Sequence, residues 1–191
     1  AADDATVSHH AALQFHGRAY SLWSQVTFFT RRSVRPFRFG AMEFVPVKPP
    51  GLVARRADLG GGIELVATGG GKVRVTTLER ALVDVLHTPA LGGDWEEIWR
   101  SLEMVEFFDL EAVVAHTQAL RTAVTAARVG FFLAEHREAL FVEDRHLDAL
   151  EELRPRQPRY LDASRSPGQL VKRWQLIVPE RVLRRSWEEV A

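Results

Sequence analysis

One change of periodicity, near residue 76, constrains the fold more than any other feature of the chain. Before it, short aromatic and β-branched runs typical of strands occupy 25–30, 37–39, 41–48, 63–67 and 72–75. From 77 to 154, apolar residues recur at helical spacing instead. A strand-rich segment (6–76) followed by a helical one (77–154) predicts an α+β domain.

The sequence predicts one helix before the strands and one after them. Residues 8–17 combine an N-cap candidate, Ser8, with apolar positions at helical spacing and Gly17 at the end, where a left-handed residue is favoured. At 76–79, Thr-Thr-Leu-Glu predicts a capping box between Thr76 and Glu79. The helix that follows has an apolar face and ends at Pro89, so it should pack against the core.

The sequence of the second half of the chain predicts four more helices, one strand and a short final helix. The helices are expected at 94–104, 109–120, 122–140 and 142–153, the strand at 169–178 and a short basic helix at 179–189. We expect the strand to rejoin the first sheet. The chain should then be a single domain, 1–191, in which a mixed or antiparallel sheet packs against a bundle of helices.

Composition excludes several classes of protein. The chain has no cysteine, which removes disulfides, thiolate nucleophiles and cysteine metal sites. Its 25 basic and 25 acidic residues balance, so any attraction to nucleic acid must be local. No stretch approaches the ~20 apolar residues of a membrane span, and the N-terminus lacks signal-peptide character. We therefore expect a cytoplasmic protein with no membrane contact.

Catalytic motifs fail when their context is considered. The run Gly69-Gly70-Gly71-Lys72 continues with valine and joins two strands, so it predicts a hairpin loop and not a phosphate loop. His9, His10 and His16 lack helical metal-site spacing, which favours capping and packing. No catalytic residue, metal or cofactor is expected.

A second group of histidines and acids keeps one enzymatic alternative open. It comprises His136, Glu143, Asp144 and His146. A solvated junction between two helices is the favoured interpretation. The alternative is a metal-dependent nuclease that uses this cluster.

Arginines provide the best candidate contact residues. Phosphate contacts, or contacts with a partner protein, are expected from a set that surrounds the predicted hairpin and from a pair that follows it: Arg31, Arg32, Arg35, Arg38, Arg55 and Arg56. The alternative is that these arginines solubilise strands and pair with carboxylates, in a protein-interaction domain with no nucleic-acid role.

Aromatic residues in the helical half mostly predict core. Trp95 and Trp99 share one helical face, as core residues do. Phe107-Phe108 and Phe141-Val142 are the exceptions that would mark a partner surface.

The order of these motifs resembles a known family. Ser8-His9-His10-Ala11-Ala12-Leu13, His16-Gly17, Val26-Thr27, Thr30-Arg31-Arg32, Phe44-Val45-Pro46-Val47 and Val73-Arg74-Val75-Thr76-Thr77-Leu78-Glu79-Arg80-Ala81-Leu82-Val83-Asp84 together are similar to the C-terminal domain of AbiEi-type antitoxins. These are transcriptional regulators of type IV toxin–antitoxin, or abortive-infection, systems. The resemblance covers residues ~6 to 90 well.

The resemblance implies a non-enzymatic function. The family pairs this domain with a preceding winged helix, represses its own operon and counters a nucleotidyltransferase-like toxin without necessarily binding it. Operator DNA and the toxin are thus the implied partners. Nothing before Ser8 could form a winged helix, and the chain begins at Ala1, so we expect a trimmed protein or a stand-alone variant.

Overall fold

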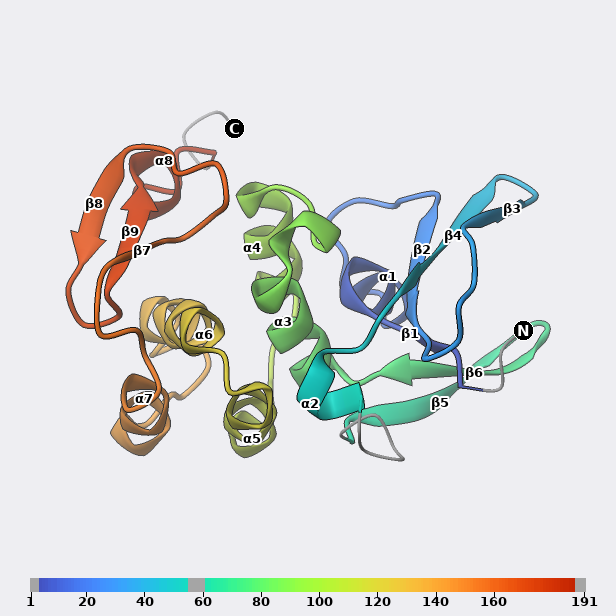
Figure 1. Ribbon diagram of the computed structural model, residues 1–191, viewed down its shortest axis with the longest axis horizontal. Coiled ribbons are helices and arrows are strands. Elements are labelled where there is room, and N and C mark those ends of the chain that lie inside the picture. Colours follow the sequence, from blue (N-terminus) through green and yellow to red (C-terminus); the bar gives the residue numbers. More distant parts are fainter. Residues whose placement is uncertain (1–3, 55–60, 188–191) are drawn as a thin grey trace.

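The computed structural model describes residues 4–54 and 61–187, in which two sheets lie at opposite ends of the molecule (Figure 1). The larger sheet has six strands in the order β3-β4-β2-β1-β6-β5. Its strands are β1 (Thr6–Val7), β2 (Gln25–Phe29), β3 (Phe37–Phe39), β4 (Met42–Val47), β5 (Ile63–Thr68) and β6 (Gly71–Thr76). The predicted α+β class is confirmed.

The larger sheet is mixed because two of its pairings are parallel. β4 lies parallel to β2 with Val26 opposite Phe44, and β1 lies parallel to β6. β3 and β4 form the hairpin, and Gly40 takes a φ of 61° at its turn, a conformation that favours glycine. The chain must therefore cross over β4 between the end of β2 and the start of β3. We call this segment, residues 30–36, the crossover.

Helix α1 (His9–Phe15) packs against β2 and β6 on one face of this sheet. Ser8 occupies its N-cap position without a side-chain capping bond, and Gly17 follows its end at a φ of 68°. The two-residue strand β1 and the single turn α2 (Gly51–Ala54) have no counterpart in the sequence prediction, because both are too short to show a period.

Helix α3 (Leu78–His87) is the centre of the molecule. Its N-cap is Thr77, which accepts a hydrogen bond from the backbone N–H of Arg80. The predicted cap, Thr76, is wrong by one residue because Thr76 still belongs to β6. Glu79 does not close a capping box; its carboxylate instead accepts from the N–H of Asp109. Seven consecutive residues, 80–86, are buried, so α3 has no solvent-facing side along them.

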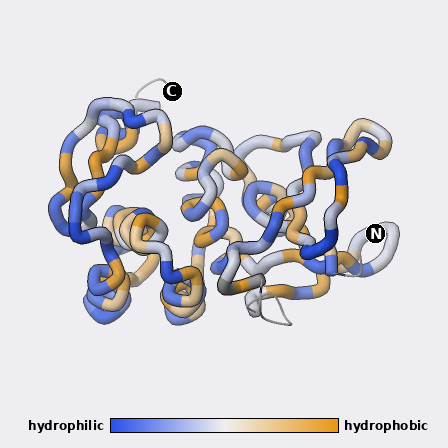
Figure 2. Tube along the Cα trace, in the orientation of Figure 1, coloured by the Kyte–Doolittle hydropathy of each residue, from blue (hydrophilic) through white to orange (hydrophobic). Residues whose placement is uncertain are grey.

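Four helices follow α3: α4 (Trp95–Glu103), α5 (Leu110–Leu120), α6 (Ala123–Glu135) and α7 (Asp144–Glu151). Of these, α5 and α6 pack against the other side of α3. The hydrophilic residues of α5 and α7 lie toward the lower edge of the view in Figure 2. Asp94 and Asp109 cap α4 and α5 as predicted. The helix predicted at 122–140 stops at Glu135, where the His136 ring contacts the Phe132 carbonyl and the chain turns. A short 3-10 turn at Pro89–Leu91 lies between α3 and α4.

The predicted strand at 169–178 does not rejoin the larger sheet. It is a hairpin of β8 (Gly168–Val171) and β9 (Leu176–Pro179), which pairs with β7 (Arg159–Tyr160) in a separate three-stranded sheet, and a single turn α8 (Glu180–Leu183) follows. The physical reason is Trp174, which is buried against α6. A Cβ on Gly130 of α6 would lie 2.2 Å from this ring, so glycine leaves the room that the indole needs.

Arg128 of α6 ties the smaller sheet to α3. Its Nε donates to the Leu161 carbonyl at 2.7 Å, and its Nη1 donates to the Leu86 and His87 carbonyls at 3.0 and 3.3 Å. Burial lowers the pKa of Arg128 to about 10, so it stays charged at neutral pH. It thereby satisfies carbonyls at the end of α3 that have no partner within the helix. None of the described helices is long and apolar enough to cross a bilayer.

The buried face of α3 places two ionisable side chains next to each other. Arg80 Nε lies 3.5 Å from Asp84 Oδ2, Arg80 Nη1 donates to the Gly61 carbonyl, and the guanidinium lies over the Phe29 ring. The cavity beside the pair measures about 10 Å³, which is room for one water molecule. Burial raises the pKa of Asp84 to about 7, against the lowering effect of Arg80.

This pKa predicts a pH-dependent stability. Between pH 4 and 7 folded Asp84 keeps a proton that the unfolded chain releases, so its contribution to stability falls as pH rises. Buried His9, whose pKa is lowered to about 3 by burial, acts in the opposite direction. Asp84→Asn removes only the first effect. Its unfolding free energy relative to wild type should therefore rise by up to about 1.4 kcal/mol per pH unit from pH 5 to 7.

Urea denaturation of both proteins at pH 5, 6 and 7 measures this difference. An Asp148→Asn variant on exposed α7 is the control, and its curve should run parallel to wild type. Parallel curves for Asp84→Asn would contradict the assigned protonation of Asp84.

Candidate functional site

The crossover carries three of the predicted contact residues and is fixed at its first turn. Asp4 accepts from the Thr30 hydroxyl at 2.8 Å and from the Arg31 N–H at 2.8 Å, while Lys48 Nζ donates to the carbonyls of Arg31 and Arg32. Although burial raises the pKa of Asp4, these hydrogen bonds lower it overall. The crossover therefore leaves β2 in a defined direction.

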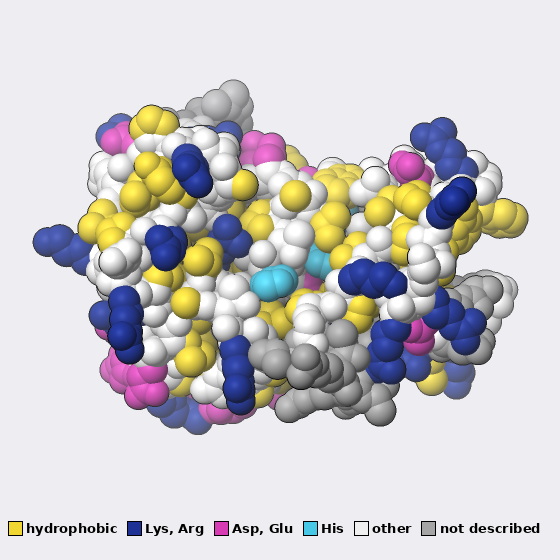
Figure 3. Space-filling view, viewed as in Figure 1, with side chains coloured by type: hydrophobic (Ala, Val, Ile, Leu, Met, Phe, Trp, Pro, Cys, Tyr) yellow, Lys and Arg dark blue, Asp and Glu magenta, His cyan; other side chains and the backbone are white. Residues whose placement is uncertain are grey.

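All four arginines of this region have exposed side chains. Arg31, Arg32 and Arg35 lie in the crossover and Arg38 in edge strand β3; Arg55 and Arg56 lie outside the described residues. Arg35 and Arg38 have no ion-pair partner within the described parts of the chain, although Arg38 lies opposite Glu43 in the β3–β4 ladder. Figure 3 shows Lys and Arg side chains around this end of the molecule.

An apolar groove of about 490 Å³ lies on the face of the larger sheet away from α1. Its floor is formed by residues of four strands, and none of the residues that line it belongs to a helix. The floor residues are Val7, Val26, Phe28, Phe44 and Val73. α1 thus covers one face of the sheet, and the other presents a concave apolar surface.

The crossover forms the wall of this groove. Val34 and Phe37 line it, and the Phe37 ring stacks on Phe44 with ring centroids 4.9 Å apart. Phe37 remains 48% exposed and Phe39, two residues along β3, 78% exposed. Large apolar side chains therefore reach solvent beside the exposed Arg35 and Arg38.

Sequence reasoning identified the arginines and missed the groove. The alternation of Val26 with Phe28, and of Phe37 with Phe39, was an available signal, because such residues share one face of a strand. The parallel pairing of β2 with β4 brings Phe44 beside Val26. No local sequence pattern indicates this pairing, because neighbouring strands were expected to form simple hairpins.

The three N-terminal histidines pack and bond inside the protein, as predicted. His9 contacts the Ser8 hydroxyl and the Phe29 ring, and His16 Nε2 lies 2.8 Å from the Thr76 carbonyl. His10 stacks on Trp23 with ring centroids 3.7 Å apart.

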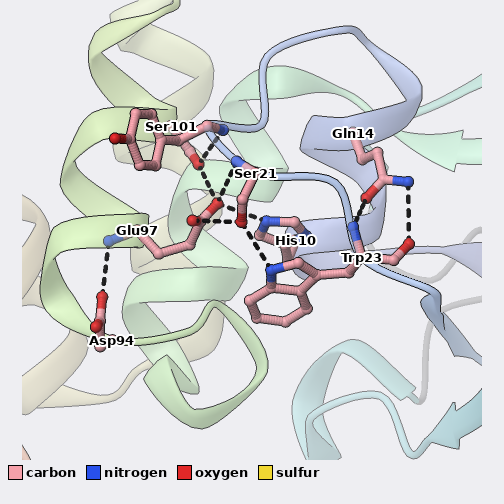
Figure 4. A network of polar contacts seen from close by, with 8 residues as sticks. His10, Gln14, Ser21, Trp23, Asp94, Glu97 and Ser101 are labelled. Atoms are coloured by element: carbon pink, nitrogen blue, oxygen red, sulfur yellow. Dashed lines mark hydrogen bonds and ion pairs between the residues drawn. The ribbon is translucent and has the colours of Figure 1, made fainter.

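Figure 4 shows the network around His10 and Glu97. Glu97 Oε1 accepts from His10 Nε2 at 2.8 Å and from the Ser21 N–H at 3.0 Å, and its Oε2 accepts from the Ser21 hydroxyl at 2.6 Å. Burial lowers the pKa of His10; hydrogen bonds lower that of Glu97 despite its burial. A neutral imidazole and a carboxylate thus join α1 to α4 in a network whose role is structural.

The second histidine cluster is divided between different partners. His136 Nε2 lies 2.8 Å from Glu103 Oε1, whereas His146 contacts Glu111 at 3.2 Å and the backbone N–H of Glu143. Asp144 forms an ion pair with Arg137. Within residues 4–54 and 61–187, no three histidines or acids form a group that could hold a metal ion.

Of the four residues predicted to mark a partner surface in the helical half, two are exposed and two are buried. Phe107 and Phe141 are 73% and 81% exposed. Their neighbours Phe108 and Val142 are buried in the core, because each adjacent pair places its two side chains on opposite sides of the chain.

Comparison with known proteins shows the fold. No model of a known protein family matches the sequence, and no curated protein matches it either. The structure is similar to the crystal structure of the RV2827C protein from Mycobacterium tuberculosis, with a TM-score of 0.57 and 15% sequence identity over 97% of this chain and 67% of that chain. At this identity the similarity concerns the arrangement of helices and strands alone.

Proposed function

We propose that the chain is a non-enzymatic antitoxin and transcriptional-regulator domain of a type IV toxin–antitoxin system. In this proposal it counteracts a nucleotidyltransferase-like toxin in the cytoplasm and assists control of its own operon. The four exposed arginines Arg31, Arg32, Arg35 and Arg38 supply contacts with DNA phosphates or with a partner.

The first support is that the motifs carrying the family resemblance are neighbours in space. The run beginning at Ser8 forms α1, and the run beginning at Val73 forms β6 and α3, which α1 contacts. The segments Val26–Thr27 and Phe44–Val47 lie in the paired strands β2 and β4. The ordered motifs thus describe one packed unit, which is what a domain signature requires.

The observation that carries the proposal is the character of the site. Its groove is lined by apolar side chains, and the exposed cations Arg35 and Arg38 belong to the same stretch of chain as the lining residues Val34 and Phe37. Such a surface suits binding, since apolar area and exposed charge favour association with a complementary partner. The titratable groups Asp84, His10 and Glu97 hold the core together instead.

Growth rescue tests the antitoxin function. Co-expression of this chain with the nucleotidyltransferase-like protein encoded beside its gene should restore colony formation to the level of cells that carry a catalytically inactive toxin. The effect should persist for the exposed control variant Arg156→Ala, which lies far from the crossover in sequence.

Absence of rescue would contradict the proposal. This conclusion requires three controls: the toxin alone is toxic, its inactive variant is harmless, and this chain accumulates to normal levels with and without a preceding winged-helix segment.

Salt-dependent DNA binding tests the regulatory part. Replacing Arg31, Arg32, Arg35 and Arg38 by alanine should weaken binding to a duplex from the upstream region of the operon. It should also flatten the plot of log affinity against log salt concentration by about 0.9 for each phosphate that the variant no longer neutralises.

Fluorescence anisotropy over a range of salt concentrations gives both quantities. The control replaces Arg156 and Arg159, two exposed arginines of the C-terminal part, and should leave the slope unchanged. An unchanged slope in the quadruple variant would assign these arginines to a protein partner and remove the DNA role.

A further inference from the structure

We infer that the groove on the larger sheet binds an acidic segment of a partner protein, which places large apolar side chains on the groove floor and carboxylates against the arginines of the crossover. This goes beyond the antitoxin proposal and does not depend on it. It concerns the chemistry of the ligand, whatever the partner does in the cell.

The floor of the groove requires an apolar ligand group. Every side chain that lines the groove is apolar; Phe37 in its wall is 48% exposed, Val7 and Val26 on its floor are nearly buried, and the volume of about 490 Å³ accommodates a few large side chains. Burial of a Leu or Phe side chain there removes apolar area from water, which is favourable, whereas a phosphate or a sugar would give up its hydration without recovering hydrogen bonds.

The wall of the groove supplies the charge that selects the ligand. Val34 and Phe37 line the groove, while Arg35 between them is exposed. The same short segment thus presents apolar side chains to the groove and guanidinium groups to solvent. Arg31 and Arg32 lie at its start with exposed side chains.

This arrangement favours carboxylates next to the apolar anchors. Arg35 has no ion-pair partner within the described residues, and guanidinium groups bind carboxylates with two parallel hydrogen bonds. A ligand whose apolar side chain enters the groove beside Val34 would bring its neighbouring residues close to Arg35. Acidic residues at these positions are favoured and basic residues are opposed.

Two other occupants fit less well. Duplex DNA could meet the arginines but would leave the apolar floor facing phosphates or water. A second copy bound by a two-fold axis through the groove would set the two arginine-bearing crossovers against each other, and like charges oppose such an interface.

Peptide selection on the intact chain tests the inference. A phage library of random peptides of about 12 residues, long enough to cross a sheet of this width, is selected on wild-type protein after depletion on Val34→Asp. The enriched peptides should carry net negative charge and at least two large apolar residues. Labelled synthetic versions should bind the wild-type chain in fluorescence anisotropy.

Two variants separate the groove from the arginines. Val34→Asp places a carboxylate in the groove wall and should weaken peptide binding more than about tenfold, while the matched Val34→Leu should retain it. Arg35→Glu is a change at an exposed residue, and it should weaken binding and reduce its salt dependence. Circular dichroism melting verifies that each variant folds; if Val34→Asp does not, Arg35→Glu decides.

Several results would overturn the inference. These are failure to enrich peptides above an unrelated bait, enrichment of neutral or basic peptides, or equal binding to wild type and Arg35→Glu. Displacement of the peptide by an unrelated DNA duplex of about 20 base pairs would assign the groove to nucleic acid. Concentration-dependent association in sedimentation velocity that Arg35→Glu abolishes would assign it to a second copy. Growth rescue without peptide binding would leave the antitoxin proposal standing and remove this inference.

Discussion

The burial of residues 80–86 of α3 on every side is the constraint on which the rest of the structure depends. A helix enclosed on all sides must be covered by other elements, and α1 provides this cover on the sheet side while α5 and α6 provide it on the other. Enclosure also forces its polar groups to find partners. Arg80 and Asp84 pair with each other, and Arg128 from α6 binds the carbonyls of Leu86 and His87 at its end.

The position of the candidate site follows from this arrangement. Because α1 packs both on α3 and on the larger sheet, it joins one face of that sheet to the core that α3 organises. On the other face, Val34 of the crossover and Phe37 of β3 form the wall of the groove. The groove and its arginines are thus the surface that remains once the core is complete. A rigid sheet anchored through α1 holds the floor of the groove in place, which suits a binding site.

The sequence predicted local elements well and long-range pairing poorly. Helices with strong caps, such as α4 after Asp94, were placed within a residue, because the capping bond and the apolar period are local. The separate sheet of β7, β8 and β9 was missed because it depends on Trp174 meeting Gly130, which no local pattern encodes. For the site, exposed arginines were evident in the sequence, whereas the groove requires Val7, Val26, Phe44 and Val73 to meet across four strands.

Native-state hydrogen exchange tests most directly whether α3 joins both halves into one cooperative unit. The amides of α3, α1 and α6 should exchange only through global unfolding, with equal opening free energies that fall in parallel as urea is added, while exposed crossover amides exchange faster. Distinct opening free energies for α1 and α6, with α3 following one of them alone, would show that the sheet and the helical half unfold separately and would contradict the central role of α3.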